Sequence, residues 1–78
     1  MTKFKATFPG NKKVDVEFDK YTVNTDQKKT YGGDDTAPEP FNIFLSSIAS
    51  CAGIYAVSFC EIRKLDTSSM FLDLEITI

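Results

Sequence analysis

The chain has 78 residues, nine of them basic and eleven acidic, which give a formal net charge of −2. This length predicts one small domain over residues 1–78, and scattered basic residues with a slight negative charge argue against a nucleic-acid surface. The sequence has no histidine, which is the most common metal ligand and general base, and two cysteines cannot complete a zinc site by themselves. We therefore expect no metal and no cofactor.

The small size also bears on stability and compartment. A domain of this length buries only about 60% of the surface of its unfolded chain, so its stability is expected to depend on a partner or another support. No signal peptide is predicted before the first strand, because Lys3 and Lys5 interrupt any apolar run there. We expect a cytoplasmic protein with reduced thiols.

The first third of the chain alternates between apolar and polar residues, as half-buried strands do. This alternation predicts strands at residues 3–8, 13–18 and 21–25, with turns at Pro9-Gly10-Asn11 and Asp19-Lys20. The second turn is short enough for a tight hairpin. We expect the three strands to form an antiparallel meander.

A polar segment, residues 26–38, follows the predicted strands and has Gly32-Gly33-Asp34-Asp35 at its centre. Its composition is typical of a mobile surface loop. A loop of this length can also be a flap over a binding site. The sequence leaves both alternatives open.

The segment 41–60 is the centre of the chain, because it has twenty residues without a charge and contains both cysteines. Its apolar residues recur at helical spacing and predict a helix from Pro40, as its first residue, to about Lys64. One face is apolar throughout and the other mixes polar with bulky apolar residues, so we expect packing on the chain's own sheet and on a second surface. A membrane span is the alternative by length, but Asn42 and four serines dilute the apolar character, and we expect no membrane partner.

The residues after the helix predict one further strand. Apolar residues alternate there with mostly polar ones: Met70, Leu72, Leu74, Ile76 and Ile78 against Phe71, Asp73, Glu75 and Thr77. The unpaired edge of such a strand favours pairing with another chain. The expected fold is α+β: a three-stranded antiparallel meander, one long central helix and one further strand, assembled as a dimer.

The two cysteines are nine residues apart, so in one helix they point to opposite sides, about 13 Å apart along the axis. They are not expected to form a disulfide with each other. Cys60 is interpreted as a buried small apolar residue.

Cys51 lies at the boundary between apolar and hydroxyl-bearing side chains of the predicted helix. It is either an ordinary packed residue or a thiol that is partly sheltered and still reachable. A reactive thiolate needs a helix N-terminus, a cation or a base nearby, and no Lys or Arg lies within one turn of Cys51. An activating charge would have to come from Lys28 and Lys29, from a second subunit, or from residues that this chain lacks.

Several pieces in this order along the chain resemble the OsmC/Ohr family, the osmotically inducible and organic-hydroperoxide-resistance proteins. They are the strand–turn–strand segment 13–26, Gly32-Gly33 before Ala37-Pro38, Pro40 opening a long helix, and the small-residue run from Ser46 to Ser50 that ends at Cys51. The resemblance implies an α+β fold that dimerises through its long central helices. It also implies thiol-dependent, peroxiredoxin-like reduction of organic hydroperoxides in oxidative-stress defence, with Cys51 attacking the peroxide oxygen and an external thiol as reductant.

Three departures from the family pattern bear on activity. Its peroxidases have a Glu ten residues before the cysteine, where this chain has Phe41, and an Arg in the N-terminal strands, whereas this chain has none before Arg63. Their resolving cysteine lies in a later segment, and Cys60 is not its equivalent. The sequence looks like the N-terminal half of a member of the OsmC-like branch. Two interpretations remain: a redox protein with catalytic Cys51, or a weakly active or inactive domain that forms a homodimer through the central helix and final strand.

Overall fold

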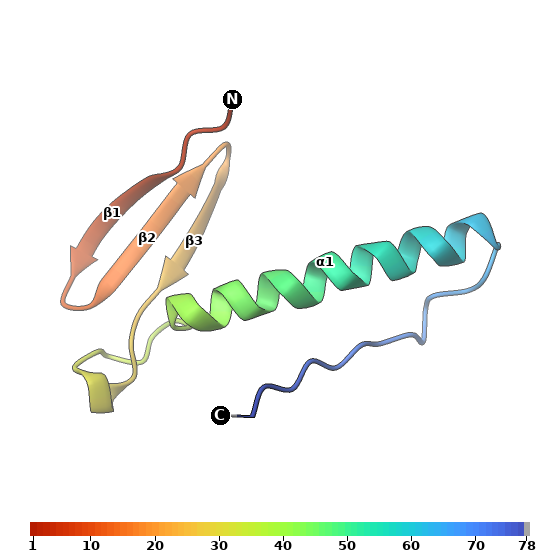
Figure 1. Ribbon diagram of the computed structural model, residues 1–78. Helices are drawn as coiled ribbons and strands as arrows, with labels where there is room; N and C mark the ends of the chain where they lie inside the picture. Colours follow the sequence, from red (N-terminus) through yellow and green to blue (C-terminus); the bar gives the residue numbers. More distant parts are fainter. Residues whose placement is uncertain (78) are drawn as a thin grey trace. The chain divides into compact units, whose positions relative to one another are not determined.

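The structure, a computed structural model, describes residues 1–77 and contains a small sheet and one long helix (Figure 1). The elements are β1 (Lys5–Gly10), β2 (Lys13–Phe18), β3 (Tyr21–Thr25), the 3-10 helix η1 (Lys29–Tyr31) and α1 (Pro40–Ile62). They confirm the α+β class and the three-stranded antiparallel sheet. The chain divides into two compact units, the first comprising Met1–Ile43 and the second beginning at Phe44.

The sheet has the order β1-β2-β3, and each strand is antiparallel to its neighbour. Phe18 pairs with Tyr21, which confirms the two-residue hairpin predicted at Asp19-Lys20. Asp19 has a φ of 52°, a value that two-residue hairpin loops require because it matches the twist of the strands.

The first strand begins and ends two residues later than predicted. The loop before β2 is Asn11-Lys12, closed by pairing of Gly10 with Lys13, and not Pro9-Gly10-Asn11. The register shifts between Thr7 and Gly10, as in a β-bulge, and Gly10 has a φ of 151°. The bulge takes Pro9 into the strand, where its missing N–H leaves the ladder incomplete.

One face of the sheet is apolar, as the alternation predicts. Ala6, Val16 and Val23 are paired across the three strands, and the two valines are only half-buried. The ring of Phe18 lies on this side, with its centroid 5.0 Å from that of Phe4. Among residues 1–77 no hydrophobic side chain is buried, so this face is not covered as a core would be.

Helix α1 begins where Pro40 allows it to begin. The Glu39 carbonyl accepts hydrogen bonds from the N–H groups of Asn42 at 3.0 Å and Ile43 at 3.2 Å. Proline suits the first helical position because its missing N–H would have no partner in the helix. The observed start therefore confirms the predicted one.

The helix ends in a Schellman motif. Lys64 has the left-handed φ of 56°, the Leu65 N–H donates to the Cys60 carbonyl at 2.8 Å, and the Lys64 N–H donates to the Glu61 carbonyl at 3.1 Å. Glycine usually occupies this left-handed position, and here it is a lysine, whose charge suits the negative end of the helix. The sequence therefore placed the end of the helix within two residues.

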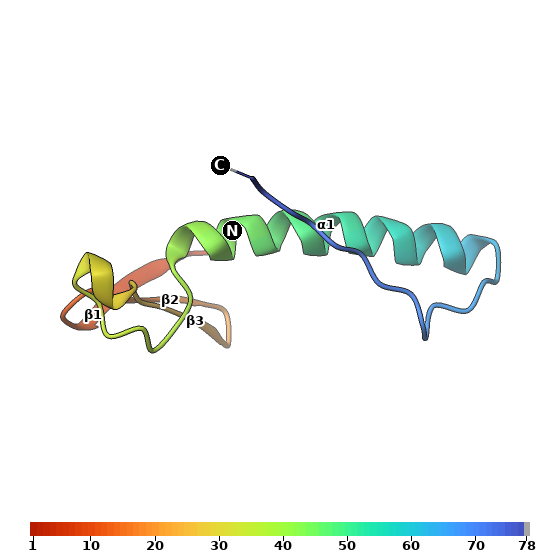
Figure 2. The same ribbon diagram turned by 90° about the horizontal axis from the view of Figure 1, so that it is seen from below.

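The chain reverses direction after α1, and residues 70–77 run back along the helix (Figures 1 and 2). Asp66 stabilises the reversal by accepting hydrogen bonds from the Ser68 N–H and hydroxyl at 3.0 and 2.9 Å. The further strand predicted at residues 70–78 does not form within 70–77, and Ile78 lies outside the described residues. A strand requires a ladder partner, and this segment has none in the described part of the chain.

Helix α1 is exposed along its length. No residue of α1 is buried, and by length and composition alone the helix could cross a membrane, a test that the core helices of soluble proteins also pass. The predicted packing of α1 on a sheet and on a second surface stays a prediction.

Candidate functional site

Cys51 lies in the middle of α1 and is exposed. Residues 41–62 favour a helix, because they contain no proline and only one glycine, Gly53. Exposure satisfies the first requirement of a reactive thiol, which is access for a soluble reagent.

The serines one turn before Cys51 are engaged with the helix backbone. The Ser47 hydroxyl donates to the Phe44 carbonyl at 2.6 Å, and the Ser50 hydroxyl donates to the Ser46 carbonyl at 2.9 Å. Within residues 1–77 no hydrogen bond or ion pair involves the Cys51 thiol. The basic residues predicted as activators belong to the other unit, where Lys28 lies 3.9 Å from a Glu39 carboxylate oxygen. The described contacts thus supply access to Cys51 and no activating group.

Cys60 has a different environment on the same helix. It is half-buried, both cysteines are free, and its sulfur lies 4.0 Å from the Met70 thioether sulfur. The absence of a bond between the two cysteines within the described chain agrees with the prediction from helical geometry. The sequence analysis interpreted Cys60 as a buried small apolar residue and did not predict its contact with Met70. That contact depends on the reversal of the chain after α1.

An apolar groove in the second unit is lined in part by Met70. Its volume is about 290 Å³. The lining residues come from α1 and from the returning segment: Gly53, Ala56, Val57, Met70, Phe71 and Leu72. Met70 and the residues after it therefore lie against one side of the helix.

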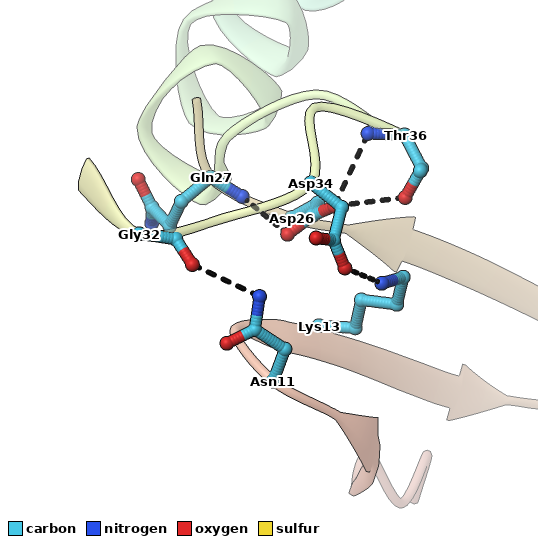
Figure 3. A network of polar contacts seen from close by, with 7 residues as sticks. All are labelled: Asn11, Lys13, Asp26, Gln27, Gly32, Asp34 and Thr36. Atoms are coloured by element: carbon cyan, nitrogen blue, oxygen red, sulfur yellow. Dashed lines mark hydrogen bonds and ion pairs between the residues drawn. The ribbon is translucent and has the colours of Figure 1, made fainter. Parts of the chain in front are cut away.

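In the first unit, Asp26 is the most buried residue and organises the loop before α1 (Figure 3). Its carboxylate accepts hydrogen bonds from the Gln27 N–H at 2.7 Å, the Thr36 N–H at 3.1 Å and the Thr36 hydroxyl at 2.8 Å. Burial acts to raise the pKa of Asp26, but these hydrogen bonds stabilise the charged form and lower the pKa to about 2. The Asp26 N–H also donates to the Pro38 carbonyl at 3.1 Å, so both ends of the loop meet here.

Two further contacts attach the loop to the β1–β2 hairpin. The Asn11 side chain donates to the Gly32 carbonyl at 2.9 Å, and Lys13 forms an ion pair with Asp34 (Figure 3). Hydrogen bonds from Lys13 and then Asn11 lower the pKa of Asp34 below its ordinary value. These two contacts attach the loop to the sheet, and the two alternatives for it, a mobile surface loop and a flap over a site, stay predictions.

Gly33 is the tightest point of this loop. A Cβ atom there would overlap the Gln27 backbone, whose carbonyl carbon would be 2.5 Å away. In the sequence, only the Gly32-Gly33 pair indicated that the loop backbone approaches another segment closely, here at Gln27. Asp26 and Thr36 gave no signal, because nine residues of loop separate them.

Two free thiols, those of Cys51 and Cys60, are present among the described residues. No group of three or more His, Cys, Asp or Glu side chains that could hold a metal ion occurs in the described residues. Asp26 already accepts three hydrogen bonds and serves to shape the segment that leads into α1.

Comparisons with protein-family models, with curated proteins and with solved structures found no match to this chain. The resemblance to the OsmC/Ohr family therefore stays a prediction from the residues quoted above.

Proposed function

We propose that this chain is a thiol redox protein of the OsmC-like type, and that it reduces organic hydroperoxides in the cytoplasm through Cys51. The observation that carries the proposal is the position of Cys51, exposed at the middle of a long helix that follows a three-stranded meander. This order of elements and this place for the thiol are those that the resemblance implies.

The proposed reaction has two stages. The Cys51 thiolate attacks the terminal oxygen of the hydroperoxide, the O–O bond breaks, and the alcohol leaves after taking up a proton, which converts the thiol to a sulfenic acid. Two equivalents of an external thiol then reduce the sulfenic acid, giving a disulfide of that thiol and water. The chain supplies the nucleophile, and the external thiol supplies the electrons.

The rate of the first stage is expected to be low. Phe41 stands where the resemblance calls for a Glu, and no Arg precedes Arg63. The described contacts place no cation or base beside Cys51, so the nucleophile lacks the activating group that fast thiol peroxidases need. We expect Cys51 to reduce hydroperoxide more slowly than the thiol of a dedicated peroxidase.

A second candidate function is that of a non-catalytic dimerisation domain. It is favoured by the exposure of large apolar side chains on α1, among them Phe44, Ile54 and Phe59, each more than half exposed. The unpaired segment 70–77 offers a strand edge to a second copy. In this proposal α1 and the final strand form a homodimer interface, and the two thiols have no catalytic role.

The two candidates are separated by one titration. The protein is treated with cumene hydroperoxide, and oxidation of each cysteine is mapped by mass spectrometry and dimedone trapping. Cys51→Ser should abolish peroxide consumption, and Cys60→Ser is the matched control that should retain it.

If Cys51 oxidises no faster than free cysteine, and Cys51→Ser consumes peroxide like the parent protein, the catalytic proposal is wrong. Light scattering of the same samples tests the dimer. A folded monomer at high concentration would contradict the dimerisation domain.

A further inference from the structure

We propose that Met70 is an oxidation-sensitive clasp, which holds the returning segment 70–77 against α1 while its thioether is reduced and releases that segment when the sulfur is oxidised to the sulfoxide. The inference is independent of catalysis by Cys51. It concerns a part of the second unit that the proposed reaction does not use.

The returning segment has few attachments to the rest of its unit. Its backbone joins no ladder, and each of its residues from Met70 to Thr77 is exposed to a large degree. Phe71 is 82% exposed, whereas Met70 is 44% exposed, close to the 49% of Leu72 and the 43% of Leu74. A segment attached by so few contacts can be displaced by a change at one of them.

Met70 attaches the returning segment to α1 through a thioether, a group that an oxidant can modify. Its sulfur lies 4.0 Å from the Cys60 sulfur, and its side chain lines the apolar groove with Ala56 and Val57. The Met70 N–H donates to the Thr67 carbonyl at 3.1 Å, so the residue is placed by the turn that follows α1. This turn directs the thioether toward the helix, and the remaining exposure leaves it open to an oxidant.

Oxidation changes the sulfur from apolar to polar. A hydroperoxide transfers its terminal oxygen to the thioether: the O–O bond breaks, an S=O bond forms, and the alcohol or water leaves with the hydroperoxide proton. The sulfoxide oxygen is a strong hydrogen-bond acceptor. Its nearest donor is the Cys60 thiol, a weak donor whose sulfur lies 4.0 Å from the Met70 sulfur, and the side chains of Ala56 and Val57 offer it none. The oxidised side chain therefore favours water over the groove.

Release would have two consequences in the same unit. The side of α1 at Gly53, Ala56 and Val57 would become fully exposed. The alternating segment 70–77 would become free to pair as a strand with another chain. Oxidant would in this way expose a part of α1 that the returning segment lines while Met70 is reduced.

The test uses the full chain in a Cys51→Ser background, treated with hydrogen peroxide and followed by peptide mass mapping and 15N relaxation. Met1, which is fully exposed, is the internal reference for thioether reactivity. We expect Met70 to gain one oxygen within a few-fold of the rate at Met1. Backbone order parameters at 71–77 should then fall below about 0.6, the range of flexible segments.

Two variants complete the experiment. Met70→Leu keeps an apolar side chain that cannot be oxidised, so its segment should stay ordered in peroxide. Met70→Gln places a polar group in the groove and should release the segment without oxidant.

Three results would each overturn the clasp: Met70 resisting oxidation while Met1 is fully oxidised, unchanged order parameters in the sulfoxide form, or loss of order in peroxide-treated Met70→Leu. Because Cys51 is absent from these samples, none of these results bears on the catalytic proposal.

Discussion

Replacing Gly33 by alanine probes the loop that leads into α1. The added Cβ would lie 2.5 Å from the Gln27 carbonyl carbon and 2.8 Å from its Cα, whereas non-bonded carbons are ordinarily about 3.5–4.0 Å apart. The loop would have to move by roughly 1 Å, against hydrogen bonds of 3.1 Å from the Gly33 N–H to Lys28 and 3.0 Å from the Asp35 N–H to Gln27. Overpacking of this kind costs about 1–3 kcal/mol.

The assay is amide hydrogen exchange at Asp35, whose N–H bond to Gln27 closes the loop. A cost of about 1–3 kcal/mol corresponds to exchange faster by roughly five-fold to more than a hundred-fold. Gly53→Ala is the matched control, because its Cβ would meet no atom within 4 Å. In the interior of α1 that change should stabilise the helix by about 0.8–1 kcal/mol. Unchanged exchange at Asp35 in Gly33→Ala would refute the close approach to Gln27.

Two other predictions concern the end of α1 and the buried carboxylate. Lys64→Gly should slow exchange of the Leu65 amide by several-fold relative to Lys64→Ala, because both lose the charge and only glycine adopts the left-handed φ without cost; equal rates would contradict the Schellman motif. Asp26 has a folded-state pKa of about 2, below its ordinary 3.8, so its contribution to stability is present above pH 3.8 and is lost as the pH falls toward 2. An NMR titration of the carboxyl measures this pKa, and Thr36→Val should raise it; a midpoint near 3.8 in the parent protein would show that the three hydrogen bonds do not form.

The elements that could be predicted from the sequence are those specified by neighbouring residues. Alternation predicted β2 and β3 to the residue, and Asp19-Lys20 predicted their hairpin. Pro40 marked the first residue of α1. The shift of β1 by two residues came from a bulge that takes Pro9 into the strand, and alternation alone cannot place an inserted residue.

The features that could not be predicted depend on residues far apart in the chain. Asp26 is buried because Thr36 folds back to donate two hydrogen bonds to it, and neither residue type alone indicates this. Met70 meets Cys60 because the chain reverses after α1. The further strand at 70–78 was predicted from the alternation of apolar and polar residues, which indicates only that a segment has two different faces. A strand also needs a neighbouring strand to pair with, and the described residues do not provide one.

The distribution of burial links these observations to the proposed assembly. Within residues 1–77 the buried residues are Thr25 and Asp26, both polar, whereas the apolar side chains of the sheet face and of α1 remain at least partly exposed. Local hydrogen bonds therefore fix the hairpins, the loop and the helix end. No hydrophobic side chain among residues 1–77 is buried, and burial of apolar surface is the main favourable term in folding. Each large apolar side chain covered would add about 1.5–3 kcal/mol. A second copy offers the same apolar faces, so the dimer proposal names a surface that can supply this term. Cys51 at the middle of α1 would then gain neighbours that one chain does not give it.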